Sequence, residues 1–107
     1  MKVKDNCWCN KQASEEILEL ESFLKIIADK NRLRIVCFLD KKGETCVCDI
    51  FKNLELSQNL TSHHLKKLRD AFLLDERKEG VFVFYSINRR EFKKQEDLLR
   101  KIILNKK

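Results

Sequence analysis

Several features of common protein classes are missing from this 107-residue sequence. No apolar run approaches the roughly 20 residues that a membrane-spanning helix needs. Residues 1–11 are polar and contain cysteine, so they lack the apolar middle of a signal peptide. We therefore expect a cytoplasmic protein with no membrane partner. The sequence also lacks a Ser, His and Asp combination or paired carboxylates that would predict catalysis, so we expect neither an enzyme nor an organic cofactor.

Five cysteines and a net charge of +6 are the features of composition that point toward a function. Because the cytoplasm keeps thiols reduced, an odd number of cysteines there favours metal binding or redox sensing over disulfides. The positive charge indicates an anionic partner, although most of the excess lies in residues 89–107. With 43% apolar residues the chain fits one small domain, to which association with a second copy would add buried surface.

The first part of the chain is predicted to be an arm followed by helices. Residues 1–13 show no periodicity and should form a mobile arm whose order depends on what Cys7 and Cys9 bind. Apolar residues at helical spacing predict one helix over residues 14–28 and a second over residues 30–39.

The second part of the chain predicts a winged helix-turn-helix. A short helix and a longer helix over residues 57–72 are joined by about three residues, as in a helix-turn-helix. Residues 73–78 and 81–87 favour strands around a Glu-Gly turn, which gives a β-hairpin wing. The fold class is therefore mainly α with a β-hairpin wing, and the domain spans residues 14–104. Four residues are predicted to cap the helices that follow them: Ser14, Asp29, Ser57 and Asn88.

The first and last predicted helices carry opposite charge. Residues 14–28 are acidic on their outer side, whereas the helix that follows Asn88 is basic, and each has an apolar stripe. We expect the two helices to pack together, either within one chain or as the interface of a homodimer.

The helix over residues 57–72 has an apolar face and a polar face. A helical projection places these residues on the core face: Leu60, Thr61, His64, Leu65, Leu68 and Phe72. On the polar face, amide, hydroxyl and imidazole groups can contact base edges, while Lys and Arg can hold phosphates. The alternative is an ordinary solvated face. The residues expected to contact DNA, two of them at the wing tip, are Gln58, Asn59, Thr61, Ser62, His63, Lys66, Lys67, Arg69, Arg77 and Lys78.

Cys46 and Cys48 form a CxC pair at the start of the short helix. Because residues two apart in a helix diverge by about 200°, both thiols can bind one ion only if Cys46 lies in an extended lead-in and Cys48 in the first turn. A structural tetrahedral site needs more ligands, and Cys7 and Cys9 are the expected second pair. Four thiolates suit Cd(II), Pb(II) or Zn(II), and three suit Pb(II) or As(III). Cys37 is expected to be a packed core thiol.

Two other interpretations stay open on the residues alone. Oxidation of the thiols to disulfides could replace metal binding as the signal, with the DNA role kept. Alternatively, the winged helix binds another protein and never touches DNA, in which case no steep salt dependence of nucleic-acid binding is expected.

Several segments resemble the ArsR/SmtB family of metal-responsive repressors. They are residues 27–35 (IADKNRLRI), 44–50 (ETCVCDI), 56–58 (LSQ), 61–69 (TSHHLKKLR) and 77–80 (RKEG), together with Tyr85. The resemblance implies a dimeric winged helix that binds double-stranded operator DNA without metal and releases it when metal binds. The cysteine-containing arm resembles the cadmium- and lead-responsive CadC branch, which implies that the thiols of the arm join the CxC pair, commonly across the dimer.

The resemblance also separates the expected metal site from two others of the family. Arsenic repressors place a third cysteine where this chain has Phe51, so this chain departs from their pattern. An arsenite-responsive repressor is kept as an alternative, as is a thiol-redox-responsive one. The family's site on the last helix uses Asp, His and Glu, and residues 89–107 contain no histidine, so we expect that site to be absent. The leading hypothesis is a repressor that binds metal through Cys7, Cys9, Cys46 and Cys48.

Overall fold

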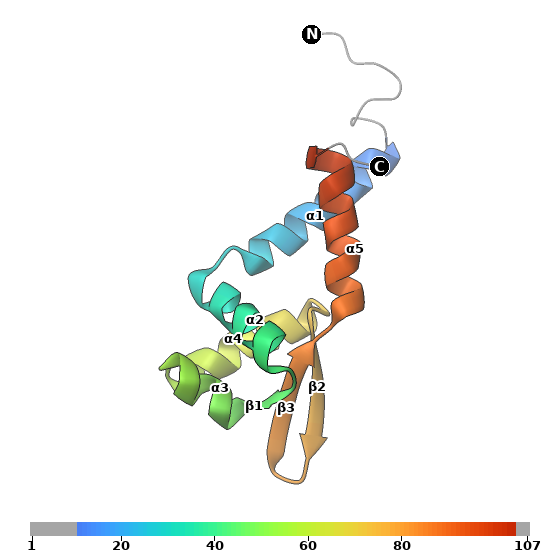
Figure 1. Ribbon diagram of the computed structural model, residues 1–107. Helices are drawn as coiled ribbons and strands as arrows, with labels where there is room; N and C mark the ends of the chain where they lie inside the picture. The colour runs from blue at the N-terminus through green and yellow to red at the C-terminus, as the bar shows by residue number, and fades with distance from the viewer. Residues whose placement is uncertain (1–10, 105–107) are drawn as a thin grey trace.

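The computed structural model describes residues 11–104, with side chains from residue 14 onward. Its α-helices are α1 (Lys11–Ile27), α2 (Lys30–Lys42), α3 (Val47–Leu54), α4 (Gln58–Asp70) and α5 (Arg89–Leu99), and α5 continues into a π-helical turn, Arg100–Leu104. The strands β1 (Thr45–Cys46), β2 (Leu74–Glu79) and β3 (Phe82–Ile87) form an antiparallel sheet in the order β1-β3-β2. Among these described helices, none has the length and apolar character needed to cross a bilayer. The fold is the predicted helical domain with a β-hairpin (Figure 1).

Capping side chains fix where three of the helices begin. The side chains of Asp29, Ser57 and Asn88 each accept hydrogen bonds from backbone N–H groups in the first turn of α2, α4 and α5. These groups have no partner within the helix, so a capping oxygen stabilises each start by about 1 kcal/mol. The three predicted caps are therefore confirmed.

The start of the first helix differs from the prediction. Helix α1 begins at Lys11, so Ser14 lies inside it and is not its N-cap. The apolar stripe used for the prediction begins only at Ile17, and a polar first turn leaves no such signal. Cys7 and Cys9 lie outside the described residues.

The core joins the helix-turn-helix to the base of the hairpin. It consists of Ile35, Leu39, Ile50, Leu65, Leu68, Leu73, Leu74 and Tyr85. These residues come from α2, α3, α4, the connection between α4 and β2, and both strands of the hairpin, so one apolar cluster joins the base of the wing to α4.

Helices α1 and α5 lie side by side and extend away from the hairpin (Figure 1). The rings of Phe23 and Phe92 meet edge to face with centroids 5.8 Å apart. The Lys94 and Lys101 amino groups each lie 2.9 Å from a glutamate carboxylate of α1. The predicted packing of the acidic and basic helices is thus confirmed within one chain. Leu18 and Ile103 are 61% and 59% exposed, so these helices also keep apolar surface, and the homodimer interface stays a prediction.

Candidate nucleic-acid interface and thiol pair

Helices α3 and α4 form the predicted helix-turn-helix. Helix α3 ends at Leu54, where Glu55 takes a left-handed conformation with φ 56°, and the Leu56 N–H donates to the Phe51 carbonyl at 3.0 Å. This left-handed stop turns the chain sharply and lets Ser57 begin α4 two residues later.

One side of α4 presents the polar groups that the sequence assigned to DNA. The side chains exposed along this side are Gln58, Asn59, Ser62, His63, Lys66 and Lys67. An exposed helix face with amide and hydroxyl groups in its first turns has the shape and chemistry to enter a major groove. Lys78 on the wing is exposed as well.

Thr61 does not belong to that exposed face. Its side chain is 0% exposed, and its hydroxyl finds no hydrogen-bond partner among the described residues. Thr61 shares the inward side of α4 with Leu65 and Leu68, which is where the helical projection also placed it. The assignment of Thr61 to DNA contact is therefore corrected.

The same projection misplaces two apolar residues. Phe72 is 71% exposed because α4 ends at Asp70 and Phe72 itself has a left-handed φ of 64°, so it does not continue the helical face. Leu60 is also exposed, since the first turn of α4 extends beyond the core.

Arg69 is bound to acidic side chains at the base of the wing. Its guanidinium lies 3.0 Å from both the Asp70 and the Glu76 carboxylate, and the Tyr85 hydroxyl donates to Glu76 at 2.7 Å. The Tyr85 hydrogen bond is the main cause that lowers the pKa of Glu76, with Arg69 adding to it, whereas burial and Glu76 raise the pKa of Tyr85 to about 12. Arg69 thus joins α4 to β2 directly and to β3 through Glu76. Its guanidinium is occupied by carboxylates and is not directed toward a DNA phosphate.

Arg77, which the sequence also assigned to DNA, is held by a carboxylate. Its Nε and Nη2 donate to the two oxygens of Glu44 at 2.9 and 3.0 Å, and the guanidinium lies 4.6 Å from the centroid of the Phe84 ring. The Arg77 hydrogen bond lowers the pKa of Glu44, so this carboxyl group stays charged at neutral pH.

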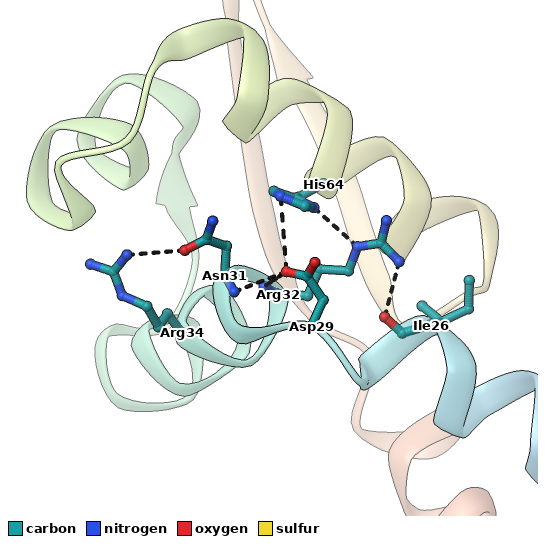
Figure 2. A network of polar contacts seen from close by, with 6 residues as sticks. All are labelled: Ile26, Asp29, Asn31, Arg32, Arg34 and His64. Atoms are coloured by element: carbon teal, nitrogen blue, oxygen red, sulfur yellow. Dashed lines mark hydrogen bonds and ion pairs between the residues drawn. The ribbon is translucent and has the colours of Figure 1, made fainter.

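A polar network joins α4 to the first two helices (Figure 2). The Arg32 Nε donates to His64 Nδ1 at 3.0 Å, and Arg32 Nη1 donates to the Ile26 carbonyl at 3.0 Å. His64 is 5% exposed, and its Nε2 lies 4.0 Å from the Asp29 carboxylate. Burial lowers the pKa of His64, so the ring is neutral at neutral pH. Because Nδ1 accepts the hydrogen bond from Arg32, the ring carries its proton on Nε2. The predicted hydrogen-bonded core histidine is confirmed.

The two thiols of the CxC pair converge as the sequence predicts. Cys46 is extended, with φ −68° and ψ 144°, and it ends β1, while Cys48 lies in the first turn of α3. A hydrogen bond between the two thiols is the main cause that raises the pKa of Cys48. Among residues 14–104, no three or more Cys, His, Asp or Glu side chains gather at one point, so any ion on this pair needs further ligands. That donor set fits a soft ion whose remaining ligands come from elsewhere.

The thiol pair and part of the α4 face line one cleft. A hollow of about 410 Å³ lies between α3, α4 and the hairpin, and its walls include Cys46, Cys48, Gln58, Ser62 and Lys78. An ion held by the thiols would therefore lie next to groups that are expected to contact DNA.

Cys37 is exposed, which corrects its prediction as a core thiol. The buried residues of α2 are Ile35 and Leu39, and Cys37 lies midway between them on the opposite side of the helix.

Comparisons with known proteins identify the family. The pattern of the bacterial regulatory proteins of the arsR family matches residues 29–75. A cadmium resistance transcriptional regulatory protein CadC from Listeria innocua is 40% identical over 78 residues, which cover 73% of this chain and 66% of that protein, slightly under two thirds. An arsenical resistance operon repressor from Bacillus subtilis is 38% identical over 78 residues, 73% of this chain and 74% of the relative. The chain belongs to the arsR family.

The fold of this arsR-family chain agrees with a solved relative. Reduced HlyU from Vibrio cholerae superposes with a TM-score of 0.71 at 34% identity, over 88% of this chain and 98% of that one. These relatives are regulatory proteins, which agrees with the prediction that the chain is not an enzyme.

Sequence reasoning missed two acidic residues that hold arginines of the candidate interface. Glu44 holds Arg77, and Glu76 holds Arg69. The sequence could have indicated the pairing of Glu76 with Arg69, because Glu76 lies on the strand that directly follows α4. Glu44 had none, because it lies 33 residues from Arg77.

Proposed function

We propose that this chain is a cytoplasmic, metal-responsive transcriptional repressor. It binds double-stranded operator DNA as a metal-free homodimer, through the exposed face of α4 and Lys78, and dissociates when a thiophilic ion binds its cysteines. The dimer forms through α1, α5 and the π-helical turn after α5, and a second copy would cover the exposed apolar side chains Leu18 and Ile103.

The convergence of Cys46 and Cys48 beside α4 is the observation that supports this proposal. The two thiols lie at the junction of β1 and α3 and share a cleft with Gln58 and Ser62. The names of the relatives, a cadmium resistance regulator and an arsenical resistance repressor, point to the same class of inducer.

The ligand set favours Cd(II), Pb(II) or Zn(II). Thiolates are soft ligands, and two more from Cys7 and Cys9 of the same or the other protomer would complete four. The bound ion would supply a direct link between the two thiols. Phe51 lines the same cleft and supplies no ligand, so arsenite would need a thiol of the arm.

The protein converts this link into lower affinity for DNA. Cys48 belongs to α3, and α3 packs against α4, so a fixed thiol pair restricts how the α4 helices of the dimer fit successive turns of the groove. A coupling of about 1–3 kcal/mol, which is roughly 5–150-fold in affinity, is the usual size of such an effect.

Serine variants test the proposal. The probe is a fluorescein-labelled duplex that the reduced, metal-free chain selects from a random-sequence pool, and its Kd is measured by anisotropy with and without Cd(II). Cys46→Ser and Cys48→Ser should bind the duplex normally and lose the response to Cd(II). Cys37→Ser, which removes an exposed thiol on α2, should keep the response. A normal response in both Cys46→Ser and Cys48→Ser would reject the site.

The same assay separates the alternative inducers. Parallel titrations with Pb(II), Zn(II) and As(III), followed by thiolate-to-metal absorption, rank the ions by stoichiometric binding. If an oxidant releases the duplex while no ion gives an absorption band, the thiols act as a redox sensor and not as a metal site.

A further inference from the structure

The thiol pair is attached to the wing as well as to α3. Strand β1 pairs with β3, so that Thr45 lies opposite Tyr85 and Cys46 lies opposite Phe84. Cys46 is therefore part of the wing sheet, while Cys48, two residues later, is part of α3. The sequence suggested only the second connection.

An ion pair fastens the segment before β1 to the other strand of the wing. Glu44 accepts two hydrogen bonds from Arg77 of β2, at 2.9 and 3.0 Å. The same guanidinium covers the ring of Phe84, the residue that faces Cys46 in the sheet. Glu44 and Arg77 are 41% and 47% exposed, so the pair adds little stability, but its two-point geometry fixes orientation.

We propose that the wing carries the metal signal together with α4, and that Glu44 and Arg77 are positioning residues that transmit it. This inference rests on the proposed function, because it concerns the path by which the thiols act on DNA binding. An ion bound to Cys46 and Cys48 joins a wing strand to a helix of the helix-turn-helix. The two DNA-contacting elements then lose their freedom to adjust to each other, since β1 is paired to β3 and clamped to β2.

This path assigns Arg77 a role different from phosphate binding. Its guanidinium contacts Glu44, Glu79 and the Phe84 ring, whereas the neighbouring Lys78 is exposed and lines the cleft with the thiols. In this part of the wing, Lys78 is therefore the cation that contacts DNA, whereas Arg77 fixes the position of β2.

The matched variants are Glu44→Gln and Asp40→Asn. Each removes one exposed carboxylate that pairs with an arginine, and each raises the net charge by one. Asp40 binds Arg89 at 2.7 Å, away from the wing clamp, so it controls for the change in charge on DNA affinity. Both variants keep all cysteines and all the α4 residues.

The first measurement uses the full reduced chain and the selected duplex. It is the ratio of the Kd for the duplex with saturating Cd(II) to the Kd without Cd(II). Glu44→Gln should reduce this ratio roughly threefold relative to Asp40→Asn, in line with one exposed bidentate pair. Cd(II) absorption should be unchanged in both. If the wild type shows no ratio above one, the proposed function itself is rejected. If the wild type responds and Glu44→Gln responds equally, only the wing path is overturned.

The second measurement needs no DNA. Hydrogen exchange of the free protein should slow in β2 and β3 when Cd(II) binds, and this slowing should be smaller in Glu44→Gln than in Asp40→Asn. Protection confined to α3 and α4 in the wild type would overturn the wing path even if the DNA assay were inconclusive through misfolding.

Discussion

Replacing Arg32 by methionine should destabilise the protein more than any other single change in its polar network. The guanidinium donates to His64 Nδ1 and to the Ile26 carbonyl, both at 3.0 Å, and so joins α2 to α4 and to the end of α1 (Figure 2). Hydrogen bonds to a charged group contribute about 1.5–3 kcal/mol each. Both bonds are partly exposed, and methionine keeps the apolar stem, so we expect a loss of about 2–4 kcal/mol in the free energy of unfolding.

Arg34 provides the control for this substitution. It lies on the same helix two residues later, and its bonds to Asn31 Oδ1 at 3.2 Å and to the Leu54 carbonyl at 2.7 Å are exposed to water. Arg34→Met should therefore cost less than about 1 kcal/mol. Urea unfolding followed by circular dichroism, at one fixed protomer concentration, measures both values. Equal losses for Arg32→Met and Arg34→Met would refute the claim that burial of His64 makes the Arg32 network decisive.

Three further predictions concern α4. Burial lowers the pKa of His64 below 6.5, so between the two pKa values the unfolded chain binds a proton that the folded chain does not. The contribution of the neutral, buried ring to stability is therefore present above pH 6.5 and is lost as the pH falls through the lowered pKa. His64→Gln should therefore flatten the decrease in urea midpoint between about pH 7 and pH 5. Thr61→Val removes a buried hydroxyl that has no partner in the part of the chain that the structure describes, and it should stabilise the fold by about 1 kcal/mol with unchanged duplex affinity. Weaker duplex binding would restore Thr61 as a contact. Lys66→Gln and Lys67→Gln should each reduce the slope of log Kd against log salt by about 1 per protomer, and an unchanged slope would remove that lysine from the interface.

Much of the helical framework could be predicted because its signals act over one turn. The caps Asp29, Ser57 and Asn88 fix where helices begin by accepting hydrogen bonds from backbone N–H groups within the next three residues. Their residue type and place in the sequence therefore suffice to predict these helix starts. The inward face of α4 followed from helical spacing, including the buried His64. The thiol geometry also followed from local rules, since two residues of a CxC pair can meet in only a few backbone conformations.

The side chains that pair with the arginines could not be predicted, because the fold brings these partners together from distant parts of the sequence. Whether Arg77 is available to DNA depends on Glu44, which lies 33 residues earlier and meets it only when β1 pairs with β3. Cys37 shows the same limit, because α2 has apolar residues on more than one side and the packing of the other helices decides which side is buried.

Strand β1 is the element that periodicity could not reveal, since two residues have no period. Its existence nevertheless follows from the requirement that the two thiols meet. Cys46 must be extended to approach Cys48, and an extended residue next to β3 presents its N–H and carbonyl groups to that strand. The conformation that allows chelation is thus the conformation that pairs with the wing. A change that drew Cys46 into α3 would separate the thiols and detach the segment from the sheet at once, so the proposed metal binding and the position of the wing depend on one backbone geometry.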